Sequence, residues 1–146
     1  MLRINVFISM LIVLTAIYLG GSYCKLHCKQ RINITRVLDG DTVEISNILN
    51  NGTKVRLIGI DCCELSPINR AYKQAYLKNI TVAEVMKYGR ESTQILEKFL
   101  QENKKPLYII PDGLDKYGRT LGIIYAGDTN INEYMVETGH CDVFYP

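Results

Sequence analysis

Three short strand-like runs constrain the fold of this chain more than any other feature. The runs are residues 31–38, 42–45 and 53–60, and apolar and polar side chains alternate in the first two. A period of two places successive side chains on opposite faces, which is typical of strands with one buried face. Asp39-Gly40-Asp41 and Asn50-Asn51-Gly52 separate the runs and accept turn conformations readily. The pattern predicts three antiparallel strands at the start of the folded domain.

The rest of the chain predicts two helices and two further strands. Between residues 91 and 103, four apolar side chains fall on one side of a 3.6-residue repeat: Ile95, Leu96, Phe99 and Leu100. Residues 106–110 and 120–125 predict strands, joined by a polar loop at 112–119. Asn130 can cap a second helix, with Glu133 three residues later, and Gly139 can end it in the left-handed conformation.

This order predicts an α+β, mainly β fold. Five short strands, with a helix between strands 3 and 4 and a second helix after strand 5, match an OB-fold, a five-stranded Greek-key barrel. Residues 31–146 would form this domain. Barrels of this kind bind many ligands, so the fold alone does not identify a function.

Residues 65–88 carry no strong periodicity and are expected to form an ordered or partly mobile loop, although residues 70–78 could make a short helix. The net charge of the whole chain is only +2, so any attraction to nucleic acid has to be local. Residues 65–90 contain one acid, Glu84, and five basic side chains, namely Arg70, Lys73, Lys78, Lys87 and Arg90. This stretch is either a solvated insertion or part of a substrate groove.

The N-terminal segment is expected to lie outside the folded domain. Residues 4–19 are apolar and carry no acidic or basic group, Arg3 precedes them, and Gly20-Gly21-Ser22 follows. These features predict a signal peptide at residues 1–22. A run of this length also falls near the ~17-residue minimum for a bilayer span, so a retained membrane anchor stays open. Residues 23–30 would then form a stalk.

The chain contains five cysteines, and their pairing does not follow from the sequence. Cys24, His27 and Cys28 lie close together, but a zinc site requires a fourth ligand. In an oxidising compartment, a disulfide between Cys24 and Cys28, or from one of them to Cys141, is the better expectation.

Several polar residues match the needs of phosphodiester hydrolysis. Asp41 starts the second strand and Asp61 ends the third, so adjacent antiparallel strands can bring two hard carboxylate ligands together for Ca²⁺. Glu64, three residues beyond, is a candidate base for water. Arg56 and Arg119 can each offer several donors to a phosphate.

Three motifs resemble the staphylococcal nuclease (thermonuclease-like) family in order and spacing. They are Asp39-Gly40-Asp41-Thr42-Val43, the segment from Val55 to Glu64, and Asp115-Lys116-Tyr117-Gly118-Arg119. The resemblance implies a Ca²⁺-dependent endonuclease that cleaves DNA and/or RNA to 3′-phosphate products. It implies a monomer outside the cytoplasm, secreted or tethered by the apolar N-terminal segment.

The resemblance also implies residue roles. Asp41, Asp61 and the main-chain oxygen of Cys62 would be Ca²⁺ ligands. Glu64 would orient the attacking water, and Arg56 and Arg119 would stabilise the phosphorane. Three further side chains would contact the nucleotide: Lys116, Tyr117 and Tyr145.

The sequence departs from the family pattern at two places that bear on activity. Cys62-Cys63 occupies the place where the family usually has a proline, so the segment that carries Glu64 loses the stiffness of proline. The chain between Glu64 and Tyr88 is longer than in well-known members. The alternative is a catalytically weak OB-fold module that binds single-stranded nucleic acid.

Overall fold

The computed structural model describes residues 28–46 and 51–145. The strands are β1 (Gln30–Asp39), β2 (Thr42–Ser46), β3 (Asn51–Leu57), β4 (Ile60–Cys62), β5 (Leu107–Leu114), β6 (Thr120–Ala126), β7 (Thr129–Asn130) and β8 (Cys141–Val143). The helices are α2 (Asn69–Lys78), α3 (Val82–Glu102) and α4 (Ile131–Glu137).

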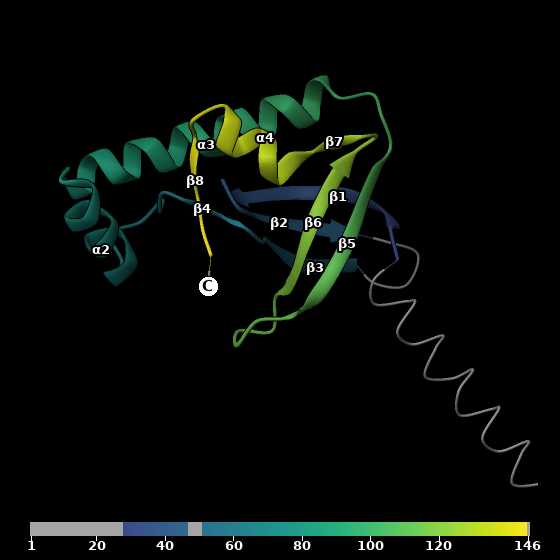
Figure 1. Cartoon of the computed structure of the whole chain (residues 1–146), viewed down its shortest axis with the longest axis horizontal. Helices are drawn as coiled ribbons and strands as arrows, with labels where there is room; N and C mark the ends of the chain where they lie inside the picture. The colour runs from purple at the N-terminus through teal and green to yellow at the C-terminus, as the bar shows by residue number, and fades with distance from the viewer. Residues whose placement is uncertain (1–27, 47–50, 146) are drawn as a thin grey trace, which may run out of the picture.

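Five of these strands close a barrel. β1 pairs with β2 and β5, β2 pairs with β3, and β5 pairs with β6, all antiparallel. A parallel pairing of residues 55–57 in β3 with residues 120–122 in β6 joins the two ends. α3 runs along one side of the barrel, and α2 lies beside the N-terminal end of α3 (Figure 1). The predicted mainly β OB-fold is confirmed.

A single buried cluster joins the barrel to two of its helices. Val43, Val55 and Ile124 fill the barrel and are inaccessible to solvent. Leu96 of α3 and Met135 of α4 belong to the same cluster. Both helices therefore bury their apolar face against the barrel, as the periodicity of residues 91–103 predicts.

Two strand boundaries differ from the sequence prediction. The third predicted strand is two strands, because a turn at Ile58 and Gly59 separates β3 from β4, and Gly59 adopts a left-handed φ of +77°. β4 then pairs with β8 in a separate two-stranded sheet instead of continuing in the barrel. β5 extends to Leu114, so the predicted loop at 112–119 is shorter than expected.

The prediction of a loop at residues 65–88 is wrong for most of its length, whereas the short helix that residues 70–78 allowed is observed as α2. This stretch forms α2 and the first two turns of α3. Ala71 and Ala75 of α2 pack against Val85 of α3 in a small buried cluster. Because alanine is only weakly apolar, the buried face of α2 differs little in hydrophobicity from its exposed face, and the periodicity in the sequence is weak.

The caps of the C-terminal helix agree with the sequence. The side chain of Asn130 accepts hydrogen bonds from the backbone N–H groups of Asn132 and Glu133 at the start of α4. Gly139 follows the helix with φ of +76°, in the left-handed region. Both residues have the expected roles.

The N-terminal predictions fall almost wholly outside the described residues. The signal peptide or anchor at 1–22 and most of the stalk at 23–30 lie there, while β1 already begins at Gln30. Lys29 lies over the rings of Tyr108 and Tyr125, at 4.9 and 4.8 Å from their centroids. Within residues 28–46 and 51–145, no helix has the length and apolar character needed to cross a membrane.

Replacing Thr81 by alanine is expected to lower the free energy of unfolding by about 1 kcal/mol. Thr81 caps α3 by accepting from Glu84 N, and the Glu84 carboxylate accepts from Thr81 N and Oγ1 in return. These bonds hold the pKa of Glu84 below its ordinary value of 4.5. The contribution of the Glu84 charge is thus present above pH 4.5 and is lost as the pH falls through the folded-state pKa.

Urea unfolding of the wild type and Thr81→Ala at pH 7 and at pH 3.5 checks this prediction. The difference between the two proteins should shrink at the lower pH. Thr93→Ala serves as the control, because Thr93 lies inside the same helix and donates to the backbone oxygen of Gly89. A constant difference at both pH values would contradict the role assigned to Glu84.

Candidate active site

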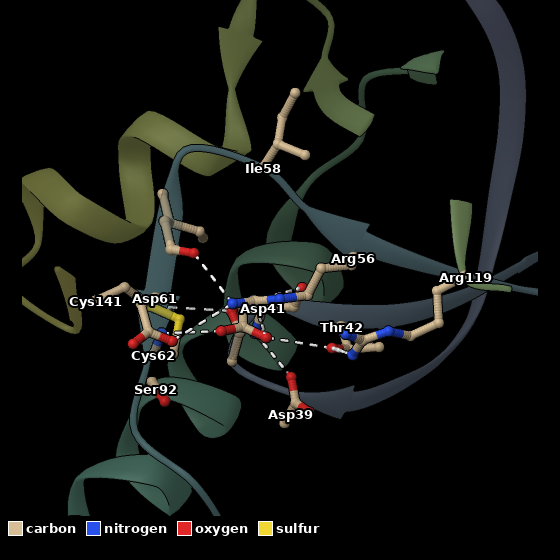
Figure 2. A network of polar contacts seen from close by, with 12 residues as sticks. Asp39, Asp41, Thr42, Arg56, Ile58, Asp61, Cys62, Ser92, Arg119 and Cys141 are labelled. Carbon is tan, nitrogen blue, oxygen red and sulfur yellow. Dashed lines mark hydrogen bonds and ion pairs between the residues drawn. A yellow bond between two sulfur atoms is a disulfide. The ribbon is translucent and has the colours of Figure 1, made fainter. Parts of the chain in front are cut away.

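Asp41, Arg56 and Asp61 meet at the mouth of the barrel. β2 pairs with β3 so that Thr42 lies opposite Arg56, which brings the preceding Asp41 to the guanidinium. Arg56 forms an ion pair with Asp41 through Nη1, and its Nη2 lies 3.4 Å from Asp61 Oδ1. Figure 2 shows the three side chains pointing toward one another. The structure therefore brings both predicted metal-binding carboxylates to one cationic group.

Asp41 and Arg56 are buried and held by the main chain, whereas Asp61 is half-buried. Asp41 is 6% exposed and Arg56 is 7% exposed. Asp41 Oδ2 accepts from Cys62 N at 2.9 Å, and Arg56 Nη2 donates to Ile60 O at 3.2 Å. These bonds connect the β1–β2 turn and β3 to β4, so main-chain groups of β4 hold Asp41 and Arg56 in place.

Burial lowers the pKa of Arg56 to about 10, and the nearby charge of Arg70 acts in the same direction. The carboxylates of Asp61 and Asp39 oppose this shift. Arg56 thus remains charged at neutral pH and can face an anion. Burial also raises the pKa of Asp39, a carboxylate that accepts from Asp41 N at 3.0 Å.

Glu64 joins the same network through α2. Arg70 bonds Asp61 Oδ1, and its Nε lies 3.2 Å from Glu64 Oε1. Burial raises the pKa of Glu64, whereas the Arg70 charge lowers it. Arg70 is thus a third arginine at this site. Its role at the site was not predictable from the sequence, because it is one of five basic residues in the stretch 65–90.

Arg119 lies immediately before β6 and reaches the network through Thr42. Its Nε donates to Asp115 Oδ2 at 2.7 Å, which fixes the guanidinium within its own turn. Its Nη1 donates to Thr42 Oγ1 at 3.4 Å, and that hydroxyl donates to Asp41 Oδ1 at 3.2 Å. The five predicted catalytic and metal-binding side chains thus belong to one polar network, part of which Figure 2 shows.

Cys62 forms a disulfide with Cys141, which connects β4 to β8. The expectation that Cys141 pairs with Cys24 or Cys28 is therefore wrong, because the β4–β8 pairing places Cys141 directly opposite Cys62. A Cys24–Cys28 bridge involves Cys24, which lies outside the described residues. The main-chain oxygen of Cys62 accepts from Gln74 Nε2 at 2.9 Å.

Comparison with known proteins identifies the family. Residues 54–145, more than half of the chain, match the family model described as "Staphylococcal nuclease homologue". The chain belongs to the staphylococcal nuclease family. The predicted family is thereby confirmed, and two of the three motifs, at residues 55–64 and 115–119, lie within the matched residues.

Three relatives illustrate the extent of the match. The chain is 31% identical over 114 residues to "Thermonuclease" of Staphylococcus intermedius, covering 77% of this chain and 60% of that protein. It is 32% identical over 119 residues to "Micrococcal nuclease" of Shigella flexneri, covering 75% and 55%. It is 30% identical over 112 residues to "Uncharacterized endonuclease" of Escherichia coli, covering 76% and 59%. The matched part of the chain thus spans less than two thirds of each relative.

In this staphylococcal nuclease homologue, the predicted nucleotide-binding residues lie in two places. Tyr117 is 73% exposed, with Lys116 Nζ at 5.1 Å and Arg119 Cζ at 5.7 Å from its ring centroid. Tyr145 follows β8 and lines a hollow of about 400 Å³. Asp61 lines a different hollow, of about 360 Å³, beside Tyr88 and Asp142. Lys116 and Tyr117 therefore adjoin the site through Arg119, whereas Tyr145 lies on a second hollow.

The donor chemistry of the site fits a hard cation. Carboxylate oxygens of Asp41 and Asp61 face the same positive group, and Cys62 is bound in a disulfide and offers no thiolate. Oxygen ligands of this kind suit Ca²⁺ rather than zinc. Among the described residues, no three His, Cys, Asp or Glu side chains are already grouped around a metal position. Main-chain oxygens, water or substrate would have to complete the coordination.

Proposed function

We propose that this chain is a Ca²⁺-dependent endonuclease that hydrolyses phosphodiester bonds of DNA and/or RNA to 3′-phosphate products. The observation that most supports this is the contact of Asp41, from the β1–β2 turn, and Asp61, from β4, with the guanidinium of Arg56. Such a pair of acids, one buried and one half-buried, beside an arginine suits the binding of a cation and a phosphate together. The names of the relatives, thermonuclease and micrococcal nuclease, agree with this activity.

In the proposed reaction, the chain binds and orients the phosphate and the attacking water. Arg56 and Arg119 donate to the non-bridging oxygens and stabilise the charge that builds up in the transition state. Glu64 accepts a proton from water as the water oxygen bonds to phosphorus. The bond between phosphorus and the 5′ oxygen breaks, Arg119 faces that oxygen, and solvent supplies its proton. The phosphate then stays on the 3′ oxygen.

Asp41, Asp61 and the main-chain oxygen of Cys62 would hold Ca²⁺ in this proposal. When bound, the ion supplies positive charge to the phosphoryl oxygens. Lys116, Tyr117 and Tyr145 would contact the nucleotide, since an exposed ring beside a cation suits base stacking and phosphate binding.

We also propose that the protein works outside the cytoplasm as a monomer. The Cys62–Cys141 disulfide supports this location, because disulfides persist in oxidising compartments and are rare in the cytosol. Residues 1–22 would be the export signal or would tether the protein to the membrane.

Digestion of a single-stranded DNA and an RNA with the purified full chain tests the proposal. We expect cleavage with Ca²⁺, none with excess EGTA, and 3′-phosphate ends by mass spectrometry. Glu64→Gln should lower kcat by about 10²–10⁴-fold, the usual contribution of a general base. Glu97→Gln, at an exposed position on α3, is the matched control. Cation-independent binding without cleavage would instead indicate the binding-module alternative.

A further inference from the structure

Gln74 of α2 bonds three groups of the segment that carries the proposed metal ligand and base. The residue is 5% exposed, which is unusual for a glutamine. Its Oε1 accepts from Glu64 N at 3.0 Å, and its Nε2 donates to Cys62 O at 2.9 Å. The same Nε2 lies 3.4 Å from Asp61 Oδ2. One carboxamide therefore spans residues 61–64.

The bonding pattern requires an amide. Only a group with an acceptor and a donor side by side can satisfy the Glu64 N–H and the Cys62 C=O at once. The segment lacks proline at Cys62-Cys63, and a partner that bonds its main chain between Cys62 and Glu64 can restore part of the lost stiffness. Gln74 provides that partner in the way that a neighbouring strand would.

A second helix holds the same segment from another side. Gly89 of α3 lies so close to it that a Cβ there would come within 2.6 Å of Glu64 O and 2.7 Å of Cys63 O. The segment thus lies against the backbone of α3 and the side chain of Gln74. Arg70, one turn before Gln74 on α2, contacts the carboxylates of Asp61 and Glu64. α2 therefore faces the site with two consecutive turns.

We propose that Gln74 is a positioning residue, which sets the place of the Glu64 carboxylate relative to Asp61 by bonding the main chain between them. This inference rests on the proposed function of Glu64. Removing a residue that orients a metal ligand or a base by a hydrogen bond typically lowers activity by about 10–100-fold.

The test is a double-mutant cycle between positions 74 and 64, measured as kcat and KM on a single-stranded oligonucleotide with Ca²⁺. Gln74→Met keeps the length of the side chain and removes both hydrogen-bonding groups. We expect it to lower kcat by about 10–100-fold with little change in KM. In the Glu64→Gln background the same change should have a much smaller effect, because the base that it positions is gone.

Gln74→Glu is the second variant, which keeps an acceptor for Glu64 N and loses the donor for Cys62 O. Its second carboxylate oxygen would face Cys62 O and Asp61 Oδ2, so its kcat should be no higher than that of Gln74→Met, and it replaces Gln74→Met in the cycle if that variant does not fold. Gln94→Met, at an exposed position on α3, is the control. Thermal melting establishes that each variant is folded.

Two results would overturn the inference while leaving the proposed function intact. In the first, the wild type cleaves and the Gln74 variants retain its kcat. In the second, the Gln74 change lowers kcat by the same factor in both backgrounds, which indicates a structural role only. A wild type that shows no cleavage would overturn the proposed function, and the positioning role with it.

Discussion

Replacing Arg56 by alanine is expected to reduce kcat/KM for phosphodiester hydrolysis by about 10³-fold or more, the usual contribution of an arginine to phosphoryl transfer. Arg56 is the group that Asp41 and Asp61 share, and it remains charged because its pKa, although lowered by burial to about 10, lies well above neutral pH. Its removal takes away the guanidinium that contacts both carboxylates. Steady-state kinetics on a single-stranded oligonucleotide with Ca²⁺ measure the effect.

The same change should also destabilise the fold, so activity has to be expressed per folded molecule. Asp41 is buried and would lose its cationic partner, and breaking a buried pair in this way costs about 3–5 kcal/mol. Circular dichroism and urea unfolding give the folded fraction under the assay conditions.

Arg36→Ala is the matched control for Arg56→Ala. Arg36 also lies on the barrel and pairs with an acid, Glu44, at 3.1 Å, but its side chain is 64% exposed. An exposed pair contributes about 0–1 kcal/mol, and this one is not part of the Asp41–Asp61 network. Near-wild-type hydrolysis by folded Arg56→Ala would contradict the proposed mechanism, whatever the control shows.

The strand pattern predicts the barrel because alternation identifies the face that each strand buries. The runs at 31–38 and 42–45 agree with β1 and β2, and the turn between them holds Asp41. Antiparallel pairing then brings Asp41 beside Arg56 without any further information. Convergence of Asp41 and Arg56 therefore follows from local sequence and strand register.

The contribution of α2 could not be predicted in the same way. Its buried residues are Ala71, Gln74 and Ala75, so its packed face is scarcely more apolar than its exposed face. Tyr76 and Leu77 lie on the exposed face, which further obscures the periodicity. A local signal did exist nearby, since Thr81 and Glu84 have the spacing of a capping box and mark the start of α3. The contacts of Arg70 and Gln74 with the site depend on tertiary packing.

The disulfide pairing could not be predicted from the sequence either, because it depends on which strands become neighbours. Cys62 and Cys141 are separated by 79 positions and meet only through the pairing of β4 with β8. Each of those strands has three residues, and such a short two-stranded sheet has little stability of its own. The disulfide is therefore expected to stabilise this part of the molecule substantially.

Removing the disulfide by the double change Cys62→Ala/Cys141→Ala is expected to lower the free energy of unfolding by about 4 kcal/mol. A crosslink across a loop of this length restricts the unfolded chain by about that amount. The loss is large against the ~5–15 kcal/mol that stabilises a typical domain. Urea unfolding followed by circular dichroism, at pH 7 with and without dithiothreitol, measures it.

Cys63→Ala separates the effect of the crosslink from that of losing a buried sulfur in the same segment. Cys63 is buried beside Cys62 and forms no disulfide, and burial raises the pKa of its thiol, which keeps it protonated and slow to exchange. Dithiothreitol should therefore destabilise the wild type and Cys63→Ala, and leave the double variant unchanged. If the double variant unfolds at the same urea concentration as Cys63→Ala, the crosslink contributes nothing to the free energy of unfolding, and non-covalent contacts hold β4 against β8.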